Sequence, residues 1–509
     1  MLARGRMGLA AATVAGSALL FAPVAAARDD IVTSFDGEPI ITSFFPAKSL
    51  AGGERAPTVL VGHGWGGPRD DDKESESSEA TGSVGIGALR EAGFNVLSWD
   101  ARGFGGSGGT VQVDSPDAEA RDVKRLIGYV AKQPEAKRDG RGDPRIGMSG
   151  ASYGGGIQLN TAAIDRRVDA IVPDIAWHSL LTSLYKDETV KSGWGAALYG
   201  IGIPTSLAPG LISPGGIQTG TLDPHITSAF TSGVATGKFS DEDRQFFKTR
   251  GPGRLVDEIR APTLLTHGTV DTLFTLDEAE SNYRILRRND VPVKMLWFCG
   301  GHGACLTDPG RAGTVERAAL RWFDRYLNRD RSTGTGARFR WVADDGKWRS
   351  ADRYPLEQKK PLEGTGDGTL PLVAGASTSG TLVASEPSPN GVDTKIDPPR
   401  RNADLVGEPQ LRITYSGTAQ PKRTVVYAQV VDRDRNLVLG NQITPIPLKL
   451  DGEEHTVKRP LEPIAARAGE GSSYAVQIVA GSNVYDLQRS TGAVDLSRIR
   501  AKLPVGDRR

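Results

Sequence analysis

The stretch that decides the fold is Gly150-Ala151-Ser152-Tyr153-Gly154, a G-x-S-x-G pentapeptide. Residues 143–149 before it are typical of a turn leading into a short buried strand, and residues 155–163 after it are typical of a helix start rich in small side chains. In a nucleophile elbow the serine occupies such a strand-to-helix turn, where the glycines let neighbouring backbone approach. The pattern therefore predicts Ser152 as a nucleophile, the alternative being an ordinary turn.

Two downstream segments supply the partners that such a serine needs. Residues 261–271 form an apolar strand and a glycine turn that ends at Asp271, and residues 293–303 form a second strand that leads to His302 between glycines. In elbow hydrolases the acid and then the base follow the serine along the chain. A serine hydroxyl is a poor nucleophile until a histidine takes its proton, and an acid orients that histidine. We predict Ser152, Asp271 and His302 as the catalytic residues.

Other side chains compete for these roles. Asp174 also closes a strand after the serine and is the second candidate for the acid, whereas Asp100 precedes Ser152 and is excluded by chain order. Of the six histidines, His267 lies four residues before Asp271 and is expected to brace the acid turn.

The negative oxygen of a tetrahedral intermediate needs preorganised donors. One should be the backbone NH of Tyr153, directly after the nucleophile. The other should come from the loop after an upstream strand, and residues 57–67 have the form of an apolar strand followed by His-Gly-x-Gly-Gly. We therefore predict the backbone NH of Trp65 as the second oxyanion donor, the alternative being a structural glycine turn.

The chain shows no sign of nucleotide or nucleic-acid binding. A glycine-rich turn at residues 100–108 lacks the Lys-Ser or Lys-Thr pair of a phosphate cradle, and Asp100 and Arg102 are expected to pair there. The 62 Lys and Arg residues balance 61 Asp and Glu residues. Without a long basic run, nucleic acid is an unexpected partner. We expect no organic cofactor and no metal.

The glycine loop, the elbow and the two strand-end residues together resemble the α/β-hydrolase fold. More narrowly, the Ser-Tyr-Gly-Gly elbow, the large insertion before Asp271 and the β-rich tail resemble the Xaa-Pro dipeptidyl-peptidase (peptidase S15) and cocaine-esterase-like serine hydrolases. In that family a tyrosine hydroxyl commonly completes the oxyanion hole, whereas the loop here offers Trp65. The resemblance implies an α/β doubly wound sheet with a helical cap insertion and a C-terminal β-sandwich.

Composition divides the 509 residues into segments. Residues 28–330 are expected to form the catalytic domain, in which residues from about 175 to 253 form a helical cap rich in aromatic side chains. Alternation of period two then replaces helical spacing, so residues 331–509 are expected to form a β-sandwich, jelly-roll-like domain.

The first 27 residues have the pattern of a cleavable signal peptide. Arg4 and Arg6 precede an apolar run over residues 7–22, and small residues follow at 25–27. We expect a secreted or extracytoplasmic protein with no stable membrane insertion after cleavage.

The two cysteines, Cys299 and Cys305, lie three residues on either side of His302. In an oxidising compartment we favour a disulfide that would fix the loop carrying the base. A pair of buried thiols is the alternative, and a zinc site would consume His302.

These patterns predict a secreted serine hydrolase working through an acyl-enzyme. By resemblance the leading substrate is a small peptide with a dipeptidyl unit, and Asp187 and Glu188 in the cap are weak candidates to receive its amine. Alternatives are a carboxylesterase of the cocaine-esterase type, or a non-catalytic exported binding protein on a hydrolase scaffold. The intact Ser, Asp and His argue against the last. Oligomeric state does not follow from the sequence.

Overall fold

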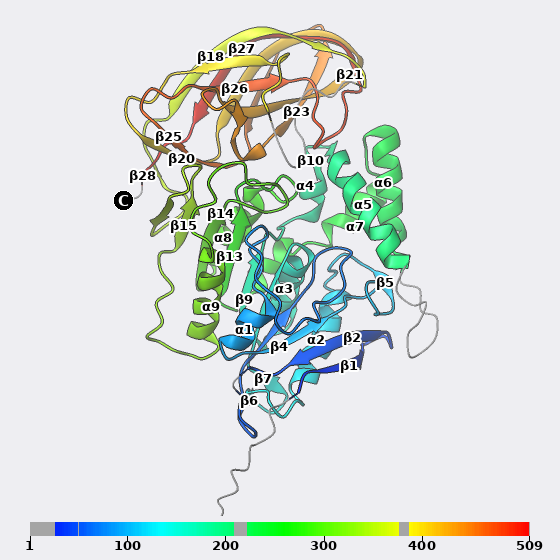
Figure 1. Cartoon of the computed structure of the whole chain (residues 1–509). Helices are drawn as coiled ribbons and strands as arrows, with labels where there is room; N and C mark the ends of the chain where they lie inside the picture. The colour runs from blue at the N-terminus through cyan, green and yellow to red at the C-terminus, as the bar shows by residue number, and fades with distance from the viewer. Residues whose placement is uncertain (1–25, 49, 208–220, 376–385, 508–509) are drawn as a thin grey trace, which may run out of the picture.

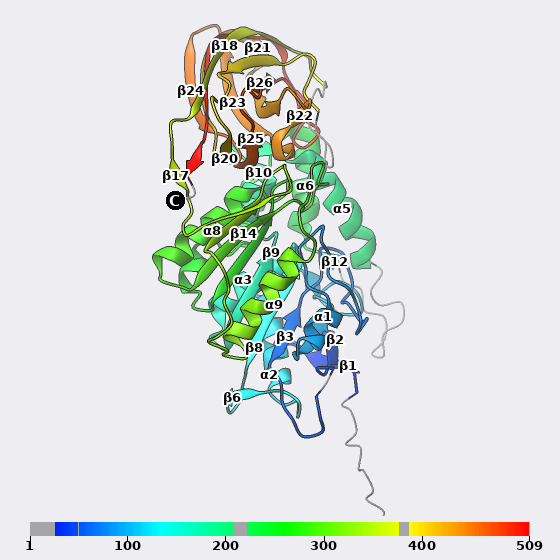
Figure 2. The same ribbon diagram turned by 60° about the vertical axis from the view of Figure 1, so that its left-hand side comes forward.

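The computed structural model describes residues 26–48, 50–207, 221–375 and 386–507. The predicted signal peptide, residues 1–27, therefore lies almost wholly outside the described residues. Figures 1 and 2 show two domains: an α/β domain in blue to green, and a β-rich domain in yellow to red at one end of it.

The α/β domain is built on a sheet that has ten strands in the described part of the chain. Their order is β1 (Arg28–Thr33), β2 (Pro39–Phe45), β4 (Asn95–Trp99), β3 (Thr58–Val61), β8 (Ile146–Ala151), β9 (Val168–Asp174), β13 (Thr263–Gly268), β14 (Val293–Phe298), β15 (Phe339–Val342) and β16 (Trp348–Ala351). The strands from β4 to β15 run parallel, and both edges are antiparallel. Parallel strands place all their carboxyl ends at one edge of the sheet, where ligands of open α/β sheets bind.

Helices cover both faces of this sheet, as Figure 2 shows for α8 and α9. One face packs on α2 (Glu119–Val130), α3 (Tyr153–Ile164) and α8 (Leu276–Arg288), and the other on α1 (Ile86–Glu91) and α9 (Thr314–Tyr326). Successive strand residues alternate between the faces: Leu60 lies in the first core and Val59 in the second. Because both faces are buried, the strands have the continuous apolar sequences noted above.

The cap lies between β9 and β13. Its elements are α4 (Leu180–Leu184), the hairpin β10 (Tyr185–Lys186) and β11 (Thr189–Val190), α5 (Ser192–Leu207), β12 (Thr221–Leu222), α6 (Pro224–Thr236), α7 (Asp241–Lys248) and the 3-10 helix η1 (Gly253–Glu258). β12 pairs with β5 (Thr110–Val111) of the catalytic domain. The Ser240 hydroxyl accepts from the Asp243 backbone NH at 3.0 Å and so caps α7. A buried apolar cluster joins cap and catalytic loops, so the cap is packed down on the carboxyl edge of the sheet.

In its described residues the C-terminal domain has two sheets. The smaller one is β17 (Glu357–Gln358), β28 (Gly506–Asp507), β20 (Ala403–Gly407) and β25 (Ile464–Ala468). The larger one is β22 (Leu437–Val438), β21 (Gln410–Asp432), β26 (Tyr474–Val479), β19 (Val392–Ile396), β18 (Leu362–Leu372) and β27 (Thr491–Leu503), with β23 (Thr444–Asp451) and β24 (His455–Pro460) paired to β21. Residues of both sheets share one apolar core. The domain is β-rich as expected, and its assignment as a jelly roll stays a prediction.

The catalytic sheet extends beyond the domain boundary predicted at residue 330. β15 pairs with β14 in parallel and β16 closes the edge, so the sheet runs to Ala351. The buried Phe339 and Trp341 side chains of β15 belong to the catalytic core. In the described part of the chain no helix combines the length and the apolar character needed to cross a membrane.

Candidate active site

Ser152 occupies the turn between β8 and α3 with φ 59° and ψ −116°. A positive φ is uncommon for a residue with a side chain and marks a constrained turn. The flanking glycines are required by close backbone approach, because an ideal Cβ on Gly150 or Gly154 would lie 2.4 or 2.2 Å from the Gly62 carbonyl oxygen. The sharp turn places the Ser152 side chain at the carboxyl edge of the sheet.

The structure brings Ser152, His302 and Asp271 together in series. His302 Nε2 lies 2.8 Å from Ser152 Oγ, and His302 Nδ1 lies 2.6 Å from Asp271 Oδ2. The contacts span 150 and 31 residues of sequence. Such a series lets the imidazole accept the hydroxyl proton while the carboxylate stabilises the charge that forms.

Asp271 is held as a carboxylate by its surroundings. Its side chain is fully buried, and Oδ1 accepts the backbone NH groups of Leu273 at 3.0 Å and Phe274 at 2.9 Å. Burial by itself would raise the pKa of this carboxyl, but the charge and hydrogen bond of His302 outweigh it and lower the pKa. Asp271 is therefore negatively charged at neutral pH and aimed at His302.

The second candidate for the acid, Asp174, has another environment. Its side chain accepts the Thr266 hydroxyl, and burial raises the pKa of its carboxyl well above the usual value. The structure places Asp271, not Asp174, against the imidazole. The expected bracing role of His267 is confirmed, since its Nε2 lies 2.7 Å from the Phe274 carbonyl oxygen just after the acid.

The two predicted oxyanion donors are backbone NH groups on two different loops. Tyr153 is the first residue of α3, so its NH has no carbonyl one turn earlier in the helix to bind. Trp65 lies in the loop after β3, where its indole Nε1 donates to the Leu198 carbonyl of the cap at 2.9 Å. Both residues line the hollow beside Ser152. The oxyanion role of these two NH groups stays a prediction.

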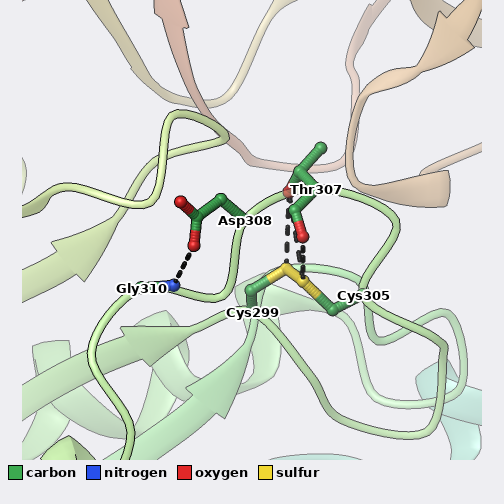
Figure 3. Close-up of a disulfide and its surroundings, with 5 residues drawn as sticks. All are labelled: Cys299, Cys305, Thr307, Asp308 and Gly310. Carbon is green, nitrogen blue, oxygen red and sulfur yellow. Dashed lines mark hydrogen bonds between the residues drawn. A yellow bond between two sulfur atoms is a disulfide. The ribbon is translucent and has the colours of Figure 1, made fainter.

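A disulfide joins Cys299 and Cys305, with the two Cα atoms 5.4 Å apart (Figure 3). It closes the loop that carries His302, and both sulfurs also lie near Thr307. Because the sulfurs are bonded to each other, they cannot serve as thiolate ligands of zinc. Nor does any group of three or more His, Cys, Asp and Glu side chains in the described ranges form a metal-binding arrangement.

The expected pairing of Asp100 with Arg102 is wrong. The Asp100 carboxylate accepts hydrogen bonds from the Arg69 backbone NH at 2.6 Å and from the Arg69 guanidinium at 2.9 Å. The Arg102 guanidinium donates two hydrogen bonds to the Asp122 carboxylate, at 2.7 and 2.6 Å. Neighbours in a turn can point to opposite sides, and each charge here finds its partner on another element.

Comparison with known proteins places these features in a family. A family model described as X-Pro dipeptidyl-peptidase (S15 family) matches residues 41–304, just over half of the chain. A Rhodopirellula baltica protein provisionally named Xaa-Pro dipeptidyl-peptidase is 24% identical over 340 residues, which cover 64% of this chain and 50% of that protein. An uncharacterised Pseudomonas aeruginosa protein is 34% identical over 122 residues, 24% of this chain and 29% of its own length. The chain thus matches half or less of the length of these relatives.

Solved structures show the same fold over nearly the whole chain. A CocE/NonD family hydrolase of Staphylococcus aureus is 15% identical with a TM-score of 0.64, covering 97% of this chain and 99% of that one. An aminopeptidase of a marine sediment Thaumarchaeota archaeon is 12% identical with a TM-score of 0.69, covering 95% and 96%. An α-amino acid ester hydrolase is 13% identical with a TM-score of 0.66, covering 97% and 100%. At these identities the likeness concerns fold alone.

Proposed function

Because the chain belongs to the X-Pro dipeptidyl-peptidase (S15) family of α/β-hydrolases, we propose that it is a serine hydrolase that works through an acyl-enzyme on Ser152. The observation that supports this most strongly is the unbroken series of contacts from Ser152 Oγ through His302 to Asp271. A non-catalytic binding protein would have no need of a strained serine in contact with a histidine that is itself hydrogen-bonded to a buried aspartate.

In the proposed reaction Ser152 Oγ attacks the substrate carbonyl carbon while His302 Nε2 takes the hydroxyl proton. The carbonyl electron pair moves onto oxygen, where the NH groups of Tyr153 and Trp65 stabilise it. When the pair returns, the bond to the leaving group breaks and His302 gives that group its proton. Water, deprotonated by the same imidazole, then releases the acyl group and restores the serine. Asp271 keeps the imidazole oriented and stabilises its charged form throughout.

Two substrate classes fit this chemistry. Family membership favours a peptide that is cleaved after a dipeptidyl unit. On the evidence of its relatives, peptidase activity is therefore the leading candidate. A carboxylesterase is the second candidate, and the hollow beside Ser152 favours it because the lining is mostly apolar. A Gly-Pro anilide and a short acyl ester, assayed side by side, separate the two.

We also propose that the protein acts outside the cytoplasm. The pattern of Arg4, Arg6 and the apolar run after them supports export, and an oxidising compartment suits the Cys299–Cys305 disulfide. Sequencing the amino terminus of the protein recovered from outside the cell tests this. A mature chain starting near residue 28 is expected, and a chain retained with its first residues intact would contradict export.

The acyl-enzyme is tested by rapid mixing with p-nitrophenyl acetate. We expect wild type to release p-nitrophenol in a burst that approaches one equivalent of enzyme when deacylation is slower than acylation. S152A should show neither burst nor turnover, whereas S149A should keep both, because Ser149 is a buried serine of β8 that does not line the hollow. Turnover retained by S152A would move the nucleophile elsewhere.

A further inference from the structure

The hollow beside Ser152 extends from the catalytic loops under the cap. It has a volume of about 840 Å³ including the solvent at its mouth. Trp65, Ser152 and Phe274 line the catalytic side, and residues of α4, α5 and α6 line the other side. The hollow therefore adjoins the position at which the acyl half of a substrate would stay bound to the serine after the leaving group departs.

The chemistry of this lining is almost wholly apolar. Leu180, Ile226, Phe230 and Leu273 are typical of it, and no aspartate or glutamate belongs to the lining among the described residues. Its polar groups are four hydroxyls, two indole NH groups and a single ammonium, on Ser152, Tyr153, Ser192, Tyr199, Trp65, Trp177 and Lys191. A peptide or amino acid substrate with a free amino terminus would bring an ammonium group into a site that has no carboxylate to receive it.

The carboxylates that lie close in sequence or space to the lining residues do not face this hollow. Asp187 and Glu188, the sequence-based candidates for binding an amine, line a different hollow between the β10–β11 hairpin and the C-terminal domain. Asp187 there lies 3.3 Å from Arg459. Glu278, under α4, accepts the backbone NH groups of His178 and Ser179 at 2.7 and 2.9 Å. The expectation that Asp187 or Glu188 faces the substrate is therefore not supported by the structure.

Lys191 adds a repulsive charge. Its side chain is fully buried, and Nζ donates to the carbonyl oxygens of Thr272 at 2.9 Å and Leu273 at 2.8 Å. Among the described residues no carboxylate is hydrogen-bonded to this ammonium, although Glu462, Asp277 and Glu278 act on it at longer range. The Tyr485 ring centre lies 5.5 Å from Nζ. A second ammonium in the same low-dielectric hollow would lose its hydration without gaining a partner and would meet a like charge.

We propose that the site selects an uncharged, apolar acyl group, aliphatic or aromatic, and rejects acyl groups that carry a free ammonium. This rests on the proposed function, since it concerns the group transferred to Ser152. The chain would then be an esterase for apolar acyl esters, and a free amino terminus would count against a substrate rather than for it.

A matched pair of esters tests whether the site rejects an acyl group that carries a free ammonium. The p-nitrophenyl esters of 4-methylpentanoic acid and of L-leucine have the same leaving group and carbon skeleton and differ only in the α-ammonium. We expect kcat/KM for the 4-methylpentanoyl ester to exceed that for the leucyl ester by on the order of 100-fold. Equal rates, or a preference for the leucyl ester, would overturn the inference while leaving the serine mechanism intact. If neither ester is cleaved and Ser152 resists a fluorophosphonate, the proposed function fails as well.

A pair of variants tests whether this hollow is where the acyl chain lies. Ala229 on α6 is buried and lines the hollow, whereas Ala235 on the same helix is exposed and does not. In wild type kcat/KM should rise about two- to fourfold per added methylene from acetyl toward hexanoyl. A229F should lower the hexanoyl-to-acetyl ratio at least tenfold, and A235F should leave that ratio as in wild type. If A229F folds with an unchanged ratio, or if the wild-type ratio is flat, the acyl chain does not lie here.

Discussion

Gln442 of the C-terminal domain donates a hydrogen bond from Nε2 to the backbone carbonyl oxygen of Asp271, 2.9 Å away and 171 residues earlier in the chain. The contact is buried, and Gly440 beside it packs so tightly that an ideal Cβ would lie 2.5 Å from the Thr269 carbonyl oxygen. The loop around η2 (Leu439–Asn441) thus lies directly on the loop that carries the acid. The C-terminal domain contributes to the geometry of the site as well as to the bulk of the protein.

We expect Q442L to lower kcat about fivefold, the equivalent of roughly 1 kcal/mol for a lost buried hydrogen bond, with little change in KM. The reason is that Asp271 loses a constraint on its backbone while the hollow that binds substrate is untouched. Steady-state kinetics with a p-nitrophenyl ester measure both constants. Q410L, at an exposed strand position of the same domain, is the control. Equal effects of the two variants would mean that the contact has no role in positioning.

The variant D271N tests whether Asp271 is the acid that orients His302. D271N keeps the size of the side chain but removes its charge and its acceptor for His302 Nδ1–H, so kcat should fall by about 10⁴-fold. D174N is the matched control, because Asp174 is equally buried, burial raises the pKa of its carboxyl, and its side chain binds Thr266 rather than His302. It should retain most activity. The opposite ranking of the two variants would transfer the role to Asp174.

Much of this site follows from sequence because its residues lie at strand ends. The apolar runs before Ser152, Asp271 and His302 predict parallel strands, and parallel strands bring their carboxyl ends together. Glycines then identify which turns allow close approach, as the Gly62 contacts show.

Contacts that depend on tertiary packing could not be predicted from the sequence. Nothing in the pattern around Gln442 points to a partner 171 residues away. The strand-like residues 339–351 could have continued the β-rich tail, yet they extend the catalytic sheet because Phe339 and Trp341 fill its core. The sequence suggests Asp187 as a partner for a substrate amine, but the β10–β11 hairpin that carries it places its side chain against Arg459.

The disulfide should matter more for activity than its ring size suggests. By loop entropy, so short a ring stabilises the folded chain by roughly 2 kcal/mol. The ring also contains His302, so the double variant C299S/C305S should show a lower kcat along with a lower melting temperature. Reductant should affect wild type in the same way and leave the double variant unchanged. Full turnover in fully reduced wild type would show that the bridge does not position the base.

Glu119 predicts a specific dependence of stability on pH. Burial raises the pKa of its carboxyl to about 7, although the hydrogen bond that it accepts from the Gln112 backbone NH lowers this pKa in part. The folded state therefore holds this proton more tightly than the unfolded state, so the contribution is complete below the unfolded pKa and is lost as pH rises through about 7. On the order of 3 kcal/mol of unfolding free energy is involved.

Urea unfolding of wild type and E119Q between pH 4 and pH 8 checks this. E119Q should make the decline shallower than in wild type by the contribution of this one carboxyl, even if it is less stable at every pH, because other buried carboxyls with raised pKa values, such as Asp174, keep the remainder. E242Q, a change at an exposed glutamate in the first turn of α7, should retain the decline. Parallel curves for wild type and E119Q would rule out Glu119 as the titrating group.

The central claim is that Ser152 is the nucleophile, and fluorophosphonate labelling followed by peptide mass spectrometry tests it most directly. The account predicts one equivalent of label on the peptide that contains Ser152, no label in S152A, and strongly reduced labelling in H302A, because the hydroxyl depends on the imidazole for activation. Label on another serine, such as Ser192 in the same hollow, or undiminished labelling of S152A, would contradict it.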